Sequence, residues 1–262
     1  MRRLAVLAML LAVLGVAAAG CGSGGGGSAS GNDIAAAATK TARPGSLEAD
    51  FSISGQGLQA NGSGVFNTRA TRTGQLTMNV NAAGRQIPVD TIVTGDTFYM
   101  RSPVFARALS GGKQWIKLDL AKLAQQGGID LSSLLDASPT PTNALAYLEG
   151  ASKVKKDGSE SVQGAKTTHY EVTVDLERAA SHAKGSVREA LKQVIAQSGI
   201  KTLPLDVWLD DSGYIRKVSY AEHSGRRQPA QVTMELHDFG KPVSIKPPPS
   251  QAVVDLAQLQ GQ

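Results

Sequence analysis

From residue 46 onward, apolar and polar side chains alternate over many short segments, as they do in strands that bury one face. In 47–54 (LEADFSIS), Leu47, Ala49, Phe51 and Ile53 fall on one side. Similar segments recur about every 10 residues, bounded mostly by Gly or Asn. They are 64–68, 75–80, 86–93, 97–101, 114–118, 166–174, 205–209, 214–220 and 231–239. The pattern predicts an antiparallel meander of about ten strands.

Short polar sequences between these segments predict the turns. Gly95-Asp96 and 210–213 (DDSG) have the composition of hairpin turns, and Asp157-Gly158 and Gln163-Gly164 are two further candidates.

The sequence also predicts a few helices. The strongest is a single helix over 176–198, because Val187, Ala190, Leu191, Val194 and Ile195 follow helical spacing. Gly185 weakens its first half, and Gly199 is placed to end it. Shorter helices are expected over 33–41 with Asn32 as N-cap, over 143–148, and over 250–256.

No break in composition divides these elements, so we expect one α+β domain over 33–262 with a single large sheet. Twisted open sheets rarely exceed about ten strands without curling or splitting. Strong curvature of the sheet is therefore expected.

The first 21 residues have a different pattern. Arg2 and Arg3 precede an apolar run that ends in small residues and Cys21, as in a secretory signal peptide. The run is short for a membrane span, which needs about 20 residues. Ala18-Ala19-Gly20-Cys21 resembles the bacterial lipobox, with Ala18 in place of the usual Leu. That resemblance implies a diacylglyceryl group on the Cys21 thiol and cleavage between Gly20 and Cys21, so that 1–20 is a lipoprotein signal peptide. An ordinary signal peptide with a chance cysteine is the alternative.

The segment after Cys21 is suited to a tether. Residues 22–31 (GSGGGGSASG) have the composition of a flexible coil, and we assign 21–32 to a lipidated cysteine and its linker. Glycines here also match GxGxxG, but no strand precedes them, which excludes a dinucleotide-binding motif.

Composition narrows the function classes. The chain has 262 residues, one cysteine and a formal net charge of +5, of which Arg2 and Arg3 supply two. A single cysteine excludes an intrachain disulfide or a Cys-rich zinc module. The net charge is small and the lysine and arginine residues form no run, so no nucleic-acid partner is expected.

The sequence contains no recognisable catalytic or cofactor motif. GxSxG, HExxH, CxxC and P-loop patterns are absent from 21–262, so we expect neither an enzyme nor a cofactor. His223 and His237 could meet across strands, but a solvated pair is favoured over a metal site. Trp115 and Trp208 are assigned equally to core packing or to the lining of an apolar cavity.

Several segments together resemble the LppX/LprAFG-type actinobacterial lipoproteins, which share a fold with LolA-like lipoprotein carriers. They are the lipobox ending at Cys21, 95–100 (GDTFYM), 115–118 (WIKL), 168–170 (THY), and 205–213 (LDVWLDDSG) running into 215–218. The likeness spans about 39–256, and it rests on the order of the segments more than on any one of them.

The resemblance implies a strongly curved antiparallel half-barrel with helices on its concave face and an apolar cavity for acyl chains. It implies an extracytoplasmic lipoprotein, anchored to the cell membrane, that carries or presents phospholipids or glycolipids across the envelope, with a membrane transporter as a further partner. A sensor domain that binds a membrane protein is the alternative. Alternation predicts one set of cavity-lining residues: Phe51, Ile53, Met78, Val80, Tyr170, Val172, Val174, Val207, Leu209, Met234 and Leu236.

Overall fold

The computed structural model describes residues 29–55, 58–69, 73–82, 84–106, 109, 111–119, 122, 140–222 and 230–259. The predicted signal peptide, Cys21 and most of the linker lie outside these residues, as does His223.

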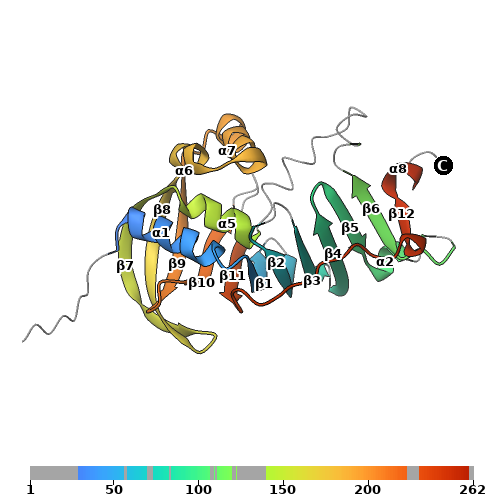
Figure 1. The fold of residues 1–262 in the computed structure, drawn as a ribbon, viewed down its shortest axis with the longest axis horizontal. Coiled ribbons are helices and arrows are strands. Elements are labelled where there is room, and N and C mark those ends of the chain that lie inside the picture. Colours follow the sequence, from blue (N-terminus) through green and yellow to red (C-terminus); the bar gives the residue numbers. More distant parts are fainter. Residues whose placement is uncertain are drawn as a thin grey trace, which may run out of the picture.

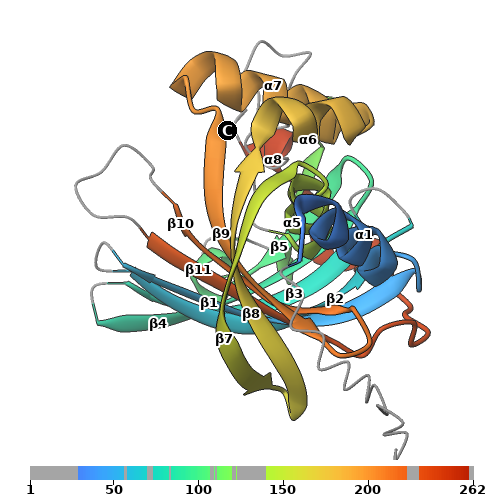
Figure 2. The same ribbon diagram turned by 90° about the vertical axis from the view of Figure 1, so that its left-hand side faces the viewer.

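The domain is built on one sheet of twelve strands (Figure 1). In chain order the strands are β1 (Ser46–Gly55), β2 (Leu58–Asn67), β3 (Thr73–Ala82), β4 (Arg85–Thr94), β5 (Thr97–Arg101), β6 (Trp115–Asp119), β7 (Ala151–Val162), β8 (Ala165–Asp175), β9 (Thr202–Asp210), β10 (Ile215–Glu222), β11 (Ala230–His237) and β12 (Val253–Asp255). Their order across the sheet is β12-β6-β5-β4-β3-β2-β1-β11-β10-β9-β8-β7. The sheet is open and strongly curved, as predicted (Figure 2).

All neighbouring strands pair antiparallel except β12, which runs parallel to β6. The prediction of a terminal helix over 250–256 is wrong in part: Ser250–Ala252 forms a 3-10 turn and Val253–Asp255 a strand. Only the short α8 (Leu256–Leu259) follows. A three-residue strand has too little alternation to be recognised, and its partner β6 lies far away in the sequence.

The remaining helices among the described residues are α1 (Gly31–Ala42), α2 (Pro103–Ala106), α5 (Pro141–Leu148), α6 (Leu176–His182) and α7 (Gly185–Ser198). The predicted single helix over 176–198 is two helices, because Gly185 adopts a positive φ of 57°. Gly199 ends α7 in the left-handed conformation, as predicted.

The N-cap of α1 is Ser30 and not Asn32, so the helix includes the last two residues assigned to the linker. Ser30 donates through its backbone N–H and its hydroxyl to Asp33, while the Asp33 N–H donates to the Ser30 hydroxyl. This reciprocal capping box lowers the pKa of the Asp33 carboxyl.

Three of the four predicted turns form. Gly95-Asp96 joins β4 to β5, Gln163-Gly164 joins β7 to β8, and 210–213 leads into β10. Asp157-Gly158 is not a turn, because it lies inside β7 where the register to β8 shifts.

The longer helices cover only part of the sheet. α1 and α5 lie over the part that contains β1 and β7–β11, and α6 and α7 stand beside them at one end of that layer (Figures 1 and 2). The main hydrophobic core of the described residues lies between these helices and the sheet, and it includes Ile34, Leu145, Leu148 and Leu176 from the helices. We call β1 and β7–β11 the covered half, and β3–β6 with β12 the open half; β2 lies between them.

Candidate functional site

The register brings all eleven predicted lining residues to one face of the sheet. Phe51 lies opposite Met234, and Met78 lies in the same row, separated from Phe51 only by Gly62. Val207 pairs with Tyr170 and, on its other side, with Val218, which pairs in turn with Met234. Residues directly opposite in neighbouring strands share a face, and the helices cover this face, which is the concave one.

The structure divides these eleven residues by burial. Seven are buried in the main core under the helices: Phe51, Tyr170, Val172, Val174, Val207, Met234 and Leu236. Ile53, Met78, Val80 and Leu209 are only partly buried. The seven therefore hold the helices onto the sheet, and their part in a ligand cavity stays a prediction.

The open half extends the same concave face with further apolar side chains, of which the sequence prediction named only Met78 and Val80. Met78 lies opposite Val89, Val93 opposite Phe98, and Phe98 opposite Leu118. Ile116 then pairs with Val254 of β12. Eleven apolar side chains here are all partly exposed among the described residues: Leu76, Met78, Val80, Ile87, Val89, Val93, Phe98, Met100, Ile116, Leu118 and Val254.

The contacts of the described helices explain this difference in burial. α1 packs against β7, β10 and α5, and α6 packs against β8 and α7. On the open half, the described helices with substantial contacts are the short α2 and α8, which meet β4, β6 and β12. The open half therefore presents a continuous apolar surface that the described helices leave accessible.

The two tryptophans lie on the opposite, convex face. Trp208 points away from the face that carries its chain neighbours Val207 and Leu209. Its ring stacks on the His169 ring with the two centroids 4.2 Å apart, and the Lys217 ammonium lies over the Trp208 ring. Trp115 lies beneath the Arg101 guanidinium, which pairs with Asp90. Both rings are buried, but neither lies on the concave face.

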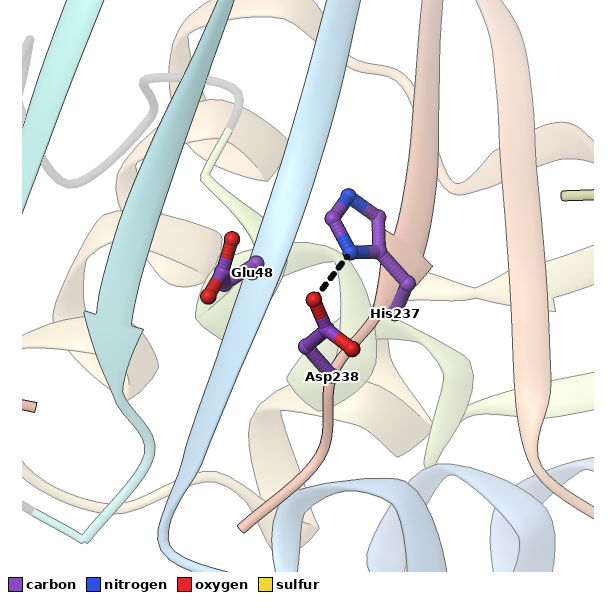
Figure 3. Close-up of side chains that lie close together, drawn as sticks. All are labelled: Glu48, His237 and Asp238. Atoms are coloured by element: carbon purple, nitrogen blue, oxygen red, sulfur yellow. Dashed lines mark ion pairs between the residues drawn. The ribbon is translucent and has the colours of Figure 1, made fainter. Parts of the chain in front are cut away.

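A second convex cluster contains residues that could bind a metal. Potential ligand atoms of Glu48, His237 and Asp238 lie within 4.8 Å of one another (Figure 3). The Lys241 ammonium lies 2.8 Å from Asp238 Oδ2, and His237 Nδ1 lies 3.2 Å from the same carboxyl oxygen. Lys241, and after it His237, lower the pKa of Asp238, and Asp238 raises the pKa of Lys241. Because Lys241 already supplies a cation, the arrangement is that of an ion-pair network.

Among the residues that the structure describes, we find no helix with the length and apolarity needed to cross a bilayer.

Comparisons with known proteins agree with this architecture. The model of the LppX_LprAFG lipoprotein family matches residues 33–245. An uncharacterized 31.2 kDa protein of Streptomyces griseus is 29% identical over 175 residues, which are 64% of this chain and 56% of that protein. A putative lipoprotein of Streptomyces coelicolor is 26% identical over 170 residues, covering 63% and 50%. The chain thus spans about half the length of these relatives.

The chain is also similar to two solved mycobacterial structures. LprF from Mycobacterium bovis superimposes with a TM-score of 0.50 at 15% identity, over 85% of this chain and 99% of LprF. LppX from Mycobacterium tuberculosis gives a TM-score of 0.45 at 14% identity, over 82% and 99%. At these identities the likeness to LprF concerns the fold alone.

Proposed function

The chain belongs to the LppX_LprAFG lipoprotein family, and from this premise we propose that it is a membrane-anchored protein that binds lipid acyl chains on the concave face of its sheet. A lipoprotein family implies an extracytoplasmic protein associated with the cell envelope, and lipid binding in general is in keeping with the carrier fold. Carriage or presentation of phospholipids or glycolipids across the envelope, with a membrane transporter as partner, is the more specific part of the proposal.

The observation that carries the proposal is the partly exposed apolar surface of the open half. Burial of apolar area releases about 25 cal/mol per Å². Acyl chains would gain this free energy along β3–β6 without requiring directed hydrogen bonds. Binding of this kind tolerates different chains and permits release, both of which a lipid carrier needs.

The anchor is a separate part of the proposal and rests on the sequence. Diacylglyceryl modification of Cys21, followed by cleavage after Gly20, would hold the domain at the membrane through two acyl chains, which bind far more stably than one. The Cys21→Ser protein should leave the membrane fraction, and its mass should show that the diacylglyceryl group is absent. Unchanged membrane association and mass would contradict the anchor without affecting the lipid site.

Two neighbouring residues of β3 test the lipid site. Met78 points to the concave face, while the exposed Asn79 points to the convex face. Met78→Lys should abolish lipid that copurifies with the protein in native mass spectrometry, because a charge on the apolar surface must be desolvated. Asn79→Lys adds the same charge and should retain the lipid. A wild-type protein that stays empty when offered phospholipids and glycolipids would refute the proposal.

A further inference from the structure

A recess of about 500 Å³ lies between α6 and α7, and none of its lining residues belongs to a strand. The two helices lie side by side at the end of the helical layer (Figure 2). Apolar Ala180, Ile195 and Ala196 line the recess together with the charged side chains of Arg188, Lys192 and Glu177. The recess is open to solvent, and its walls combine apolar side chains with a few charged groups, as ligand sites do.

Arg188 is the central charged group of the recess. Its side chain is partly buried, and its Nε donates to the backbone oxygen of Ala183 at 2.8 Å. Among the described residues, no carboxylate forms an ion pair with it. A guanidinium has five N–H donors in one plane, and their geometry matches the oxygens of a phosphate or carboxylate.

Lys192 adds a second positive charge on the same side of α7. It follows Arg188 by four residues, a spacing at which like charges destabilise a helix. Its own ion pair with Glu189, at 3.2 Å, joins two largely exposed side chains and contributes little. Glu177 also lines the recess, and its carboxylate lies 3.8 Å from Lys201 in a largely exposed pair that contributes little. Two cations and one carboxylate therefore line the recess, which leaves it a net positive charge.

The apolar wall of the recess connects it to the interior of the domain. Ala180 belongs to the main buried cluster, and Ile195 packs against that cluster. A ligand here would meet positive charge on one side and apolar side chains on the other. An anionic amphiphile has this combination of properties.

We propose that the recess between α6 and α7 binds the phosphate of an anionic phospholipid. Arg188 would form two parallel hydrogen bonds with the phosphate oxygens, and Lys192 would contribute a point charge. This assignment rests on the proposed lipid-binding function, and it adds a selectivity for the head group that an apolar surface alone cannot supply.

The test compares head groups of the lipids that copurify with the full-length protein. The processed lipoprotein is purified from bacterial membranes that contain both phosphatidylglycerol and phosphatidylethanolamine, and bound lipids are quantified by mass spectrometry. The wild-type protein should be enriched in phosphatidylglycerol relative to the membrane. Arg188→Ala/Lys192→Ala should lower the ratio of phosphatidylglycerol to phosphatidylethanolamine about tenfold or more, because the ammonium of phosphatidylethanolamine offsets its phosphate and only phosphatidylglycerol gains the full attraction of the two cations.

A matched control is Arg43→Ala/Lys166→Ala, which removes the same two charges from exposed positions outside the recess and outside the open half. It should leave the ratio unchanged. The single variant Arg188→Gln, which keeps most of the side-chain volume, should show a smaller fall of the same sign if the double variant folds poorly.

Three outcomes would overturn the assignment, and they can be distinguished. An unchanged ratio in a lipid-loaded Arg188→Ala/Lys192→Ala protein would exclude the recess and leave acyl-chain binding intact. Fatty acid in place of phospholipid in the wild type would exclude the phosphate. An empty wild-type protein would refute the proposed function itself.

Discussion

Apolar and polar residues alternate in the same way in both halves of the sheet, but the apolar residues of the concave face differ in burial between the halves. In the covered half, Val207, Met234 and Leu236 are fully buried against helices. In the open half, Val89, Phe98 and Leu118 continue the same face but remain partly exposed. Large exposed apolar patches usually mark binding sites. The comparison separates residues that hold the fold together from the residues to which we assign the ligand.

The largest expected difference comes from a charge placed in each half. Val172 is 2% exposed, so Val172→Asp should prevent folding, because an unpaired buried carboxylate costs more than the marginal stability of a domain. Circular dichroism should show lost structure. Val89→Asp in the open half should fold and lose only its lipid. If both variants fold equally well, the division into halves is wrong.

Leucine-to-alanine substitutions in the two halves test the same comparison through the free energy of unfolding. Leu236→Ala, at a fully buried position, should lower the free energy of unfolding by about 2–5 kcal/mol. Leu118→Ala, at a partly exposed position, should lower it by about 1 kcal/mol in the lipid-free protein. Urea denaturation measures both values, and equal losses would contradict the account.

A smaller effect is expected at the N-terminus of α1, which packs on the covered half. Ser30→Ala removes the capping box and should cost about 1 kcal/mol of stability. Asn32→Ala is the control, since Asn32 is not the cap. It should have a smaller effect, limited to its hydrogen bond with Arg178. A larger loss in Asn32→Ala would restore Asn32 as the capping residue.

The smallest effect concerns the ion pairs at the end of β11. Lys241 and His237 lower the folded-state pKa of Asp238 below its ordinary value of 3.8. The ionised carboxylate therefore stabilises the fold above about pH 4, and this contribution is lost as the pH falls through the lowered pKa. Lys241→Met should raise the pKa of Asp238 in an NMR titration. An unchanged pKa would show that the ion pair is not formed in solution.

Much of the fold follows from local patterns. Period-two alternation correctly assigned Phe51, Val172 and Met234 to one face, and the hairpin turn at Gly95-Asp96 formed as expected. The same alternation placed Trp208 opposite Val207 and Leu209, so its convex position was available from the sequence. The position of Ser30 as N-cap was harder to predict, because Asn32 is an equally good capping residue.

The division between the halves could not be predicted from the strands alone. Val80 and Val174 have the same residue type and the same face, yet Val174 is buried and Val80 is not. The difference depends on where α1, α5 and α6 pack, which is a long-range property. The recess between α6 and α7 was also hidden, because the sequence predicted one continuous helix there.

The most direct test of acyl-chain binding to the open half is crosslinking with a phospholipid that carries a photoreactive group on its acyl chain. After irradiation of the loaded protein, mass spectrometry of its peptides identifies the residues modified. We expect crosslinks at concave positions of β3–β6, including Met78, Val89, Phe98 and Leu118. Crosslinks confined to the convex face, or none in a protein that retains the lipid, would contradict the account.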